Sequence, residues 1–432
     1  METLKIFLEG RELYAYLNDK LRKVSVDEAL RIRRDYFVYA SLTKGGKATP
    51  MIAIEVEKGV NEYIILSTAI YLAKALKNLK FNSTYIVFHW TGAEVLINED
   101  TIPEELFKRY PSPLEAANIV SNYVLKILEN ELLKISRFFG RRIRFSTGLD
   151  KVLIPCSRTH YENKYTIYID VDEADKVLET ELHSDLCIIG SPFNAKDEDK
   201  SSKTFLLSDI AKKGIDSKPI TVKGDNISVP KIVGRFEVMA LLQTARYYLL
   251  TRDIEQAKSF GLNRAIFYAW IKYNRPQYRS LPYHSAISVH KVKEIGSSNI
   301  SKSLKVVEDE VEVRGKYFIF GDQVQKPEDF EKTIARKIDM VLPFELVWYL
   351  TLRYVSNFSL DILRDPNKFY KHVYEPVRDT YIEQLEKIIE SISKDRSGKA
   401  QVSESQRKQY KEYRYTPPIK RITEYIKNRD QS

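Results

Sequence analysis

The spacing of apolar and polar positions changes along the chain and divides it into two parts. From residue 1 to about residue 228, segments with the period of an amphipathic helix alternate with short apolar runs typical of buried strands. The segments expected to be helical are 13–34, 62–79 and 112–139, and those expected to contain strands are 35–42, 49–57, 83–98, 142–155 and 164–172. This alternation predicts an α/β domain with a mixed sheet.

The second part begins after polar connectors that contain glycine and proline, and its pattern is mainly helical. The helical segments are 236–250, 253–273, 343–358 and 379–394, and one interruption, 303–322, predicts a β-hairpin with Arg314 and Gly315 at its turn. We therefore expect an α+β protein with three parts. These are an α/β domain (1–228), a helical domain with one hairpin (229–393) and a basic tail (394–432).

Composition narrows the class of protein. With 432 residues, of which 43% are hydrophobic, the chain can form sizeable cores. No run approaches eighteen uncharged apolar residues and the first residues do not resemble a signal peptide, which predicts a cytoplasmic protein without a membrane partner. The wealth of charged residues is also typical of a thermophile, and a role on a chromosome, a plasmid or another mobile genetic element fits equally well.

The net charge of +10 favours a polyanionic partner, and the tail carries much of it. Residues 394–432 contain eleven basic and five acidic residues. Within them Lys408, Lys411 and Arg414 interleave with tyrosines, a mixture suited to stacking on bases while contacting phosphates. The alternative is a solvated tail that packs its tyrosines on its own domain.

Two acids stand at the end of the apolar run 49–57. Glu55 and Glu57 are two residues apart, so a strand would direct both carboxylates to one face. Together with a third acid from a neighbouring strand, for which Asp150 is the candidate, they would form a site for two Mg²⁺ or Mn²⁺ ions. The alternative is that the strand ends at Glu55 and leaves Glu57 solvated before Gly59.

The order of these segments resembles the small catalytic subunit of the archaeo-eukaryotic primases and the related primase-polymerases. The resemblance covers about residues 30–175 and depends on order and spacing more than on identities. The matching residues are Arg34, Tyr36 and Phe37 before the acidic strand, Glu55 and Glu57 on it, Thr91 and Gly92 at the next turn, Asp150 as the third acid, and Pro155, Ser157 and His160 after it.

The resemblance implies a DNA replication protein with metal-dependent nucleotidyl transfer on a single-stranded DNA or RNA template. Glu55, Glu57 and Asp150 would be the catalytic metal ligands. The residues implied to hold nucleotide phosphates or template are His89, Lys151, Ser157, Arg158 and His160. The partners would be nucleic acid, nucleotides and other replication proteins.

This sequence departs from the family at two places. The first family acid is nearly always aspartate, where this chain has Glu55, and the family histidine of the turn aligns with Glu94. A carboxylate at that place would repel a triphosphate. The alternative is therefore a catalytically inactive nucleic-acid-binding protein on a primase-like fold.

The two cysteines allow two interpretations. Cys156, His160, His183 and Cys187 have a symmetric spacing that could bind one zinc ion. However, residues four apart on a strand lie too far from each other to share an ion. The sequence therefore predicts buried free thiols rather than zinc.

Two further patterns lie in the helical part. Segment 257–279 resembles a helix-turn-helix with Gly261 at the turn, and its second helix would present Arg264, Lys272 and Arg275 to nucleic acid. The alternative is an amphipathic helix that packs into a core. Arg279 and His284 also have a spacing seen in some helical ribonucleases.

Overall fold

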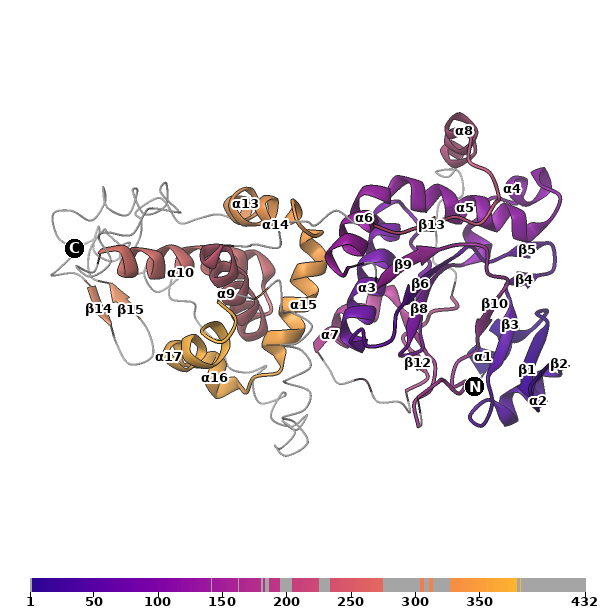
Figure 1. Cartoon of the computed structure of the whole chain (residues 1–432), viewed down its shortest axis with the longest axis horizontal. Coiled ribbons are helices and arrows are strands. Elements are labelled where there is room, and N and C mark those ends of the chain that lie inside the picture. The colour runs from indigo at the N-terminus through magenta and orange to yellow at the C-terminus, as the bar shows by residue number, and fades with distance from the viewer. Residues whose placement is uncertain are drawn as a thin grey trace, which may run out of the picture. The chain divides into compact units, whose positions relative to one another are not determined.

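The computed structural model describes residues 2–140, 142–161, 163–179, 182, 186–194, 204–224, 234–274, 304–306, 311–313, 327–378 and 381. The chain forms two compact units, Met1–Val229 and Pro230–Ser432 (Figure 1). The first contains the two largest sheets and the second is mainly helical, so the protein is of the mixed α+β class. Among the described residues, no helix is both long and apolar enough to cross a membrane.

A small antiparallel sheet lies at the start of the first unit. Its strands, in spatial order, are β10 (Lys151–Leu153), β3 (Val38–Ser41), β1 (Leu13–Leu17) and β2 (Lys20–Val24). The helix expected over 13–34 is wrong for its first half, because 13–24 forms the β1–β2 hairpin. Asn18 and Asp19 turn this hairpin with positive φ angles of 48° and 57°, the conformation that two-residue hairpin loops require.

The larger sheet has seven strands and is mixed. In spatial order they are β12 (Ile188–Ile189), β11 (Ile167–Asp170), β7 (Thr84–Phe88), β8 (Gly92–Ile97), β6 (Met51–Val56), β9 (Ile143–Ser146) and β13 (Thr221–Val222). All neighbours are antiparallel except β11 and β12.

The centre of this sheet is a split β-α-β arrangement. Strand β6 leads through α3 (Glu62–Asn78) to β7, and β8 then inserts between them. From β8 the chain passes through α5 (Pro113–Ile127) and α6 (Glu129–Phe138) to β9, on the other side of β6. This is the βαββαβ order of ferredoxin-like domains. It makes β6 a central strand, bounded by β8 and β9.

The remaining elements of the first unit are short. They are α1 (Glu2–Leu8), α2 (Val26–Ile32), β4 (Thr43–Lys44), β5 (Lys47–Ala48), η1 (Glu99–Thr101), α4 (Glu104–Arg109), η2 (Val171–Glu173), α7 (Ala174–Glu179) and α8 (Thr204–Lys213). The predicted cap of α5 is confirmed: the Ser112 side chain accepts a hydrogen bond from the Glu115 amide, with Pro113 at the first helical position.

One apolar core joins the two sheets. It combines Leu13, Ala15, Val38, Ala40, Val152 and Ile154 of the small sheet with Met51, Tyr85, Val87, Leu96 and Tyr168 of the large one. Since side chains alternate along a strand, Ala53, Glu55, Gly92 and Glu94 lie on the same face of the large sheet as Met51 and Leu96. Ile52 and Ile54 lie on the opposite face of the large sheet, and both are buried there.

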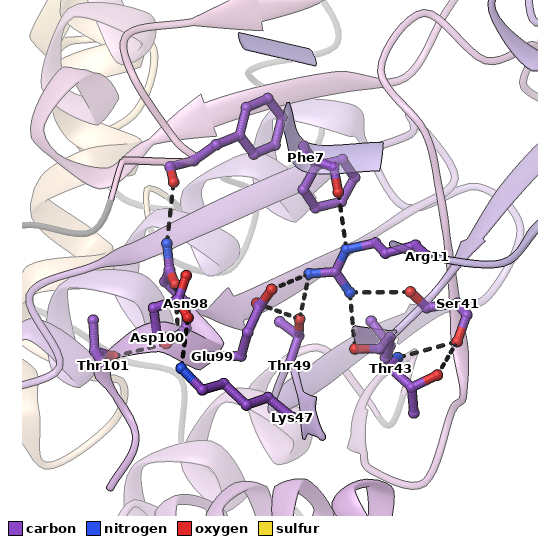
Figure 2. Close-up of polar contacts among 12 residues, drawn as sticks. Phe7, Arg11, Ser41, Thr43, Lys47, Thr49, Asn98, Glu99, Asp100 and Thr101 are labelled. Carbon is purple, nitrogen blue, oxygen red and sulfur yellow. Dashed lines mark hydrogen bonds and ion pairs between the residues drawn. The ribbon is translucent and has the colours of Figure 1, made fainter. Parts of the chain in front are cut away.

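A buried polar cluster also links the sheets (Figure 2). Arg11 lies between α1 and β1, and its guanidinium donates to the carbonyls of Phe7, Ser41 and Leu42, to Thr49 Oγ1 and to the Glu99 carboxylate. Thr49 in turn donates to the other Glu99 oxygen over 2.7 Å. The Arg11 side chain thus connects the strand ends near Ser41, Thr49 and Glu99.

The second unit is a group of helices. They are α9 (Arg235–Thr251), α10 (Ile254–Asn274), α13 (Pro327–Phe330), α14 (Arg336–Asp339), α15 (Phe344–Ser356), α16 (Leu360–Arg364) and α17 (Pro366–Phe369), with π-helical turns at Glu331–Ala335 and Tyr370–Tyr374. The predicted hairpin is present as β14 (Leu304–Val306) paired with β15 (Val311–Val313). Arg314 and Gly315, where the turn was predicted, lie outside the described residues.

The helix-turn-helix expected around Gly261 is also wrong, because α10 runs through that residue without a break. A Cβ atom at Gly261 would lie 1.9 Å from Thr244 Oγ1 and 2.8 Å from the Ala240 carbonyl oxygen, both on α9. Gly261 therefore permits close packing of two helices rather than a turn. Arg264 on the same helix is buried, at 8% exposure, which removes it from a groove-binding surface.

Candidate functional site

The two acids of β6 lie at the end of a central strand. Glu55 is the fifth residue of β6, and Glu57 follows the strand, with its amide bonded to the Arg142 carbonyl. Both residues are exposed. The sequence therefore identified an accessible acidic strand end, on the sheet face that also carries Glu94.

The strand next to Glu55 carries a base rather than a third acid. In the β6–β9 register Glu55 is opposite Arg144, and Arg144 Nη2 lies 3.9 Å from Glu55 Oε2. Ser146, on the same face of β9, donates a hydrogen bond to Glu55 Oε1. Both carboxylate oxygens of Glu55 thus have a partner on β9.

Asp150 lies in a different part of the unit. It precedes β10 of the small sheet, where its carbonyl accepts from the Leu42 amide and its carboxylate pairs with Lys151 Nζ at 2.7 Å. The expected arrangement, with Asp150 on a strand beside Glu55, is not the one found, because the chain leaves the large sheet after Ser146 and enters the small one at Lys151. Within the described ranges, no group of three or more His, Cys, Asp or Glu residues is arranged to hold a metal ion.

The turn between β7 and β8 holds a histidine and an acid. His89 Nε2 lies 3.1 Å from Glu94 Oε1, and His89 Nδ1 lies 3.2 Å from Thr91 Oγ1. Burial by itself lowers the pKa of His89, but the charge of Glu94 and its hydrogen bond outweigh burial and raise that pKa. Both ring nitrogens therefore have a partner, one in the turn and one on β8.

Gly92 makes this arrangement possible. A Cβ atom there would approach His89 Cε1 to 2.8 Å and the Ile54 carbonyl oxygen to 3.0 Å. Trp90, at the tip of the turn, has a positive φ of 69° and donates its indole N–H to the Tyr165 carbonyl at 2.9 Å. The turn is thus fixed both to its own strands and to the segment that precedes β11.

Ser157 is a structural residue of that segment. Its hydroxyl oxygen accepts from the Val38 amide at 2.8 Å, and the side chain is fully buried. It ties the segment to β3 and cannot reach a ligand at the surface. Lys151, the other predicted phosphate ligand near β10, pairs with Asp150 and lies over the Tyr14 ring.

Arg158 and His160 belong to a group of basic and aromatic side chains at the surface. We call this group the basic–aromatic surface. Its exposed members are Arg34, Tyr36, Arg158, His160 and Tyr161, and its half-buried members are Phe37, Lys164 and Tyr165. Two loops supply it, the α2–β3 connection and the β10–β11 connection. Of its members, the family resemblance had implied Arg158 and His160 as residues that hold phosphate or template, and it had matched Arg34, Tyr36 and Phe37.

The cysteines form a disulfide at the edge of this surface. Cys156 and Cys187 are bonded, with their Cα atoms 4.9 Å apart, so the expectation of free thiols is wrong. The Tyr168 amide also donates to the Cys187 carbonyl, which places the β12 segment beside β11. The β11–β12 pairing brings together two cysteines that are 31 residues apart in sequence. The spacing of the cysteines alone did not reveal this.

Several predicted residues lie outside the described residues. They are Arg275, Arg279, His183, His284, Lys408, Lys411 and Arg414, and for Lys272 the structure describes only the backbone. The residues that sequence reasoning missed are Arg144 and Ser146. Their signal was present in the segment 143–146, since two polar residues two apart on a short strand share one face, as Glu55 and Glu57 do.

Comparison with known proteins adds no family assignment. No protein-family model matches this sequence, and neither a curated protein nor a solved structure is significantly similar to it.

Proposed function

We propose that this protein binds nucleic acid in DNA replication, on a primase-like sheet that does not itself carry out nucleotidyl transfer. The observation that carries the proposal is the position of Arg144, opposite Glu55 in the β6–β9 register and 3.9 Å from its carboxylate. A guanidinium at that place repels a divalent cation and competes for the oxygen that would bind it.

The β7–β8 turn supports the same proposal. A nucleotide phosphate needs a donor that points outward, whereas the two ring nitrogens of His89 contact Glu94 and Thr91. Glu94 also brings negative charge to the sheet face where a triphosphate would lie. The phosphate-binding role predicted for His89 is therefore not part of the proposed function.

Binding is supported by charge and by side-chain type. The net charge of +10 favours a polyanion, and the basic–aromatic surface combines cations with exposed rings. The proposed partner is DNA or RNA. Other replication proteins are proposed to bind the complex of this protein with nucleic acid.

A second candidate is metal-dependent nucleotidyl transfer, in which Glu55 and Glu57 bind Mg²⁺ or Mn²⁺ without Asp150. The exposure of Glu55 and Glu57 at one strand end favours it. In that case the Arg144 side chain, which is 41% exposed, would have to turn away when metal binds.

The test is nucleotide incorporation on a primed and an unprimed single-stranded template with Mg²⁺ or Mn²⁺. Binding of the same template is measured beside it by fluorescence anisotropy. We expect salt-sensitive binding and no product, for the wild type and for Glu55→Ala/Glu57→Ala alike. Metal-dependent product that the double substitution abolishes would overturn the non-catalytic proposal and establish the second candidate.

Arg144→Asp is the matched variant, because it places a carboxylate opposite Glu55 without altering the strand. If Arg144 is what excludes metal, calorimetric titration with Mn²⁺ should detect binding to Arg144→Asp and none to the wild type. Equal Mn²⁺ binding by both proteins would show that Arg144 does not govern the site.

A further inference from the structure

We infer that a single-stranded nucleic acid stacks its bases on the basic–aromatic surface, with Tyr36 and Tyr161 as the stacking side chains. This inference rests on the proposed function and identifies the site and the form of the ligand. Tyr36 is 40% exposed and Tyr161 is 47% exposed, so each side chain is accessible to a ligand. Tyr36 lies in the α2–β3 connection close in sequence to Arg34, and Tyr161 lies in the β10–β11 connection close in sequence to Arg158.

The cations of this surface are placed against its rings. Arg34 lies over the Tyr165 ring at 5.3 Å from its centroid, and Lys164 lies 3.9 Å from the Trp90 ring centroid and 5.3 Å from that of Tyr161. These contacts hold the cations beside the rings, so that a base stacked on tyrosine would have its phosphate within reach of a positive charge.

His160 extends the aromatic area. Its ring packs on Phe37 with 4.9 Å between the centroids, and the residue is exposed. Phe37 precedes β3 and His160 precedes β11, so the contact joins the two loops. The exposed rings therefore belong to one surface rather than to two separate loops.

The backbone beneath the surface is fixed before any ligand binds. The Arg158 amide donates to the Arg33 carbonyl at 2.7 Å, and Arg158 Nη1 donates to the Asp35 carbonyl at 3.1 Å. Arg158 also forms an isolated antiparallel bridge with Tyr165. A fixed loop loses little conformational entropy on binding, which favours affinity.

The local charge selects an anionic ligand. In the sequence, segments 31–37 and 158–165 contain five lysine and arginine residues against two acids, Asp35 and Glu162. Lys164 also pairs with Glu62 at 2.9 Å, which holds its stem beside Trp90 and reduces its net contribution. The surplus of positive charge remains on Arg34 and Arg158, which are exposed.

A single strand fits these observations better than a duplex does. In a duplex the faces of the bases are covered by their neighbours, so an exposed tyrosine ring has nothing to stack on. An unpaired strand offers both ring faces and phosphates at short intervals. Every base has a ring face that can stack on tyrosine, so we expect little sequence preference.

The experiment measures anisotropy of fluorescein-labelled dT20 and rU20 with the full chain. Variants are Tyr36→Ala, Tyr161→Ala and the double variant, with Tyr110→Ala as the control, since Tyr110 is a half-buried tyrosine that follows α4 and is not part of the surface. Each surface substitution should weaken binding by about fivefold or more. Tyr36→Phe and Tyr161→Phe should retain wild-type affinity, because stacking needs the ring and not the hydroxyl.

A second measurement separates charge from stacking. Arg34→Ala should reduce the slope of log affinity against log salt by about one unit, and Arg22→Ala, an exposed arginine on β2, should not. Circular dichroism of each variant checks that the fold is retained.

The possible outcomes distinguish failure of the proposed binding site from failure of the proposed function. No binding of any oligonucleotide by the wild type would overturn both. Wild-type binding that Tyr36→Ala, Tyr161→Ala and Arg34→Ala leave unchanged would overturn the site and keep the function. Equal loss in Tyr110→Ala, or tighter binding of a duplex of the same length, would also overturn the inference.

Discussion

Arg11 and Glu99 form a buried ion pair in which all five N–H groups of the guanidinium are hydrogen-bonded. Their side chains are 2% and 7% exposed, and the charge-assisted bond joins the segment before β1 to the end of β8. Arginine carries five donors in a fixed plane, and each finds an acceptor here. The pair therefore fixes how the two sheets of the first unit meet (Figure 2).

Arg11→Met should destabilise the first unit strongly. It leaves the Glu99 carboxylate buried without its cation, which typically costs about 3–5 kcal/mol. Urea denaturation followed through Trp90, in a background of Trp270→Phe and Trp348→Phe, measures the change in the first unit. Lys23→Met is the control, because the exposed Lys23–Glu12 pair should contribute nothing measurable.

Arg11→Met combined with Glu99→Leu isolates the cause. Removing both charges should recover much of the loss, since no buried charge is then unpaired. If the double variant is as unstable as the sum of the single variants, the carbonyl contacts of Arg11 matter more than its pairing with Glu99.

Stability should depend on pH through His89 and Glu94. The pKa of His89 is raised in the folded protein, so protonated His89 stabilises the fold below its ordinary pKa, and this contribution is lost as pH rises through the raised value. The difference in unfolding free energy between wild type and Glu94→Gln should therefore be larger at about pH 5.5 than at about pH 9.

The pKa itself can be measured by NMR titration of the His89 ring. Glu94→Gln should lower it, because the neutral amide removes the charge that opposes burial. His89→Gln provides the assignment. An unchanged His89 titration in Glu94→Gln would mean that the pair does not set this pKa.

Reduction should lower the thermal stability of the first unit. The Cys156–Cys187 bond spans a sequence separation of 31 residues, for which loop closure predicts a stabilisation of about 3–4 kcal/mol. Melting curves with and without a phosphine reductant should differ for the wild type and coincide for Cys156→Ser/Cys187→Ser. Two titratable thiols in the unreduced, unfolded protein would contradict the disulfide.

Gly261→Ala should destabilise the second unit although alanine is the better helix former. Propensity alone favours alanine by about 1 kcal/mol, but its Cβ would overlap Thr244 on α9, including the backbone nitrogen at 2.7 Å. Thermal unfolding of Gly261→Ala beside Glu255→Ala, an exposed position of α10, tests this. A gain in stability for Gly261→Ala would contradict the close packing of α9 and α10 at this position.

The local pattern predicted most of the segments correctly where a single period dominated. The apolar run 51–56 is β6, the amphipathic segment from Glu62 is α3, and the strand, turn and strand near His89 is β7–β8. It failed at 13–24, because two five-residue strands joined by Asn18 and Asp19 place apolar residues at intervals that also fit a helix.

The candidate site was predicted only in part. Exposed acids at the end of β6 followed from period-two geometry, whereas the approach of residues 34–37 to 157–160 was not predicted. Arg144 lies opposite Glu55, and Asp150 does not, because the chain leaves the large sheet between them. The sequence did not show this point, because 142–155 has the pattern of one continuous strand-like segment.

By itself, the sequence determined the alternation of elements, the acidic strand end and the positive charge, because these depend on neighbouring residues and on composition. Only the tertiary structure decided that Cys156 bonds Cys187, that Glu94 closes on His89 and that Arg144 pairs with Glu55. Strand partners and registers are non-local, and they are set by packing and hydrogen bonding of the whole unit, which no short segment encodes.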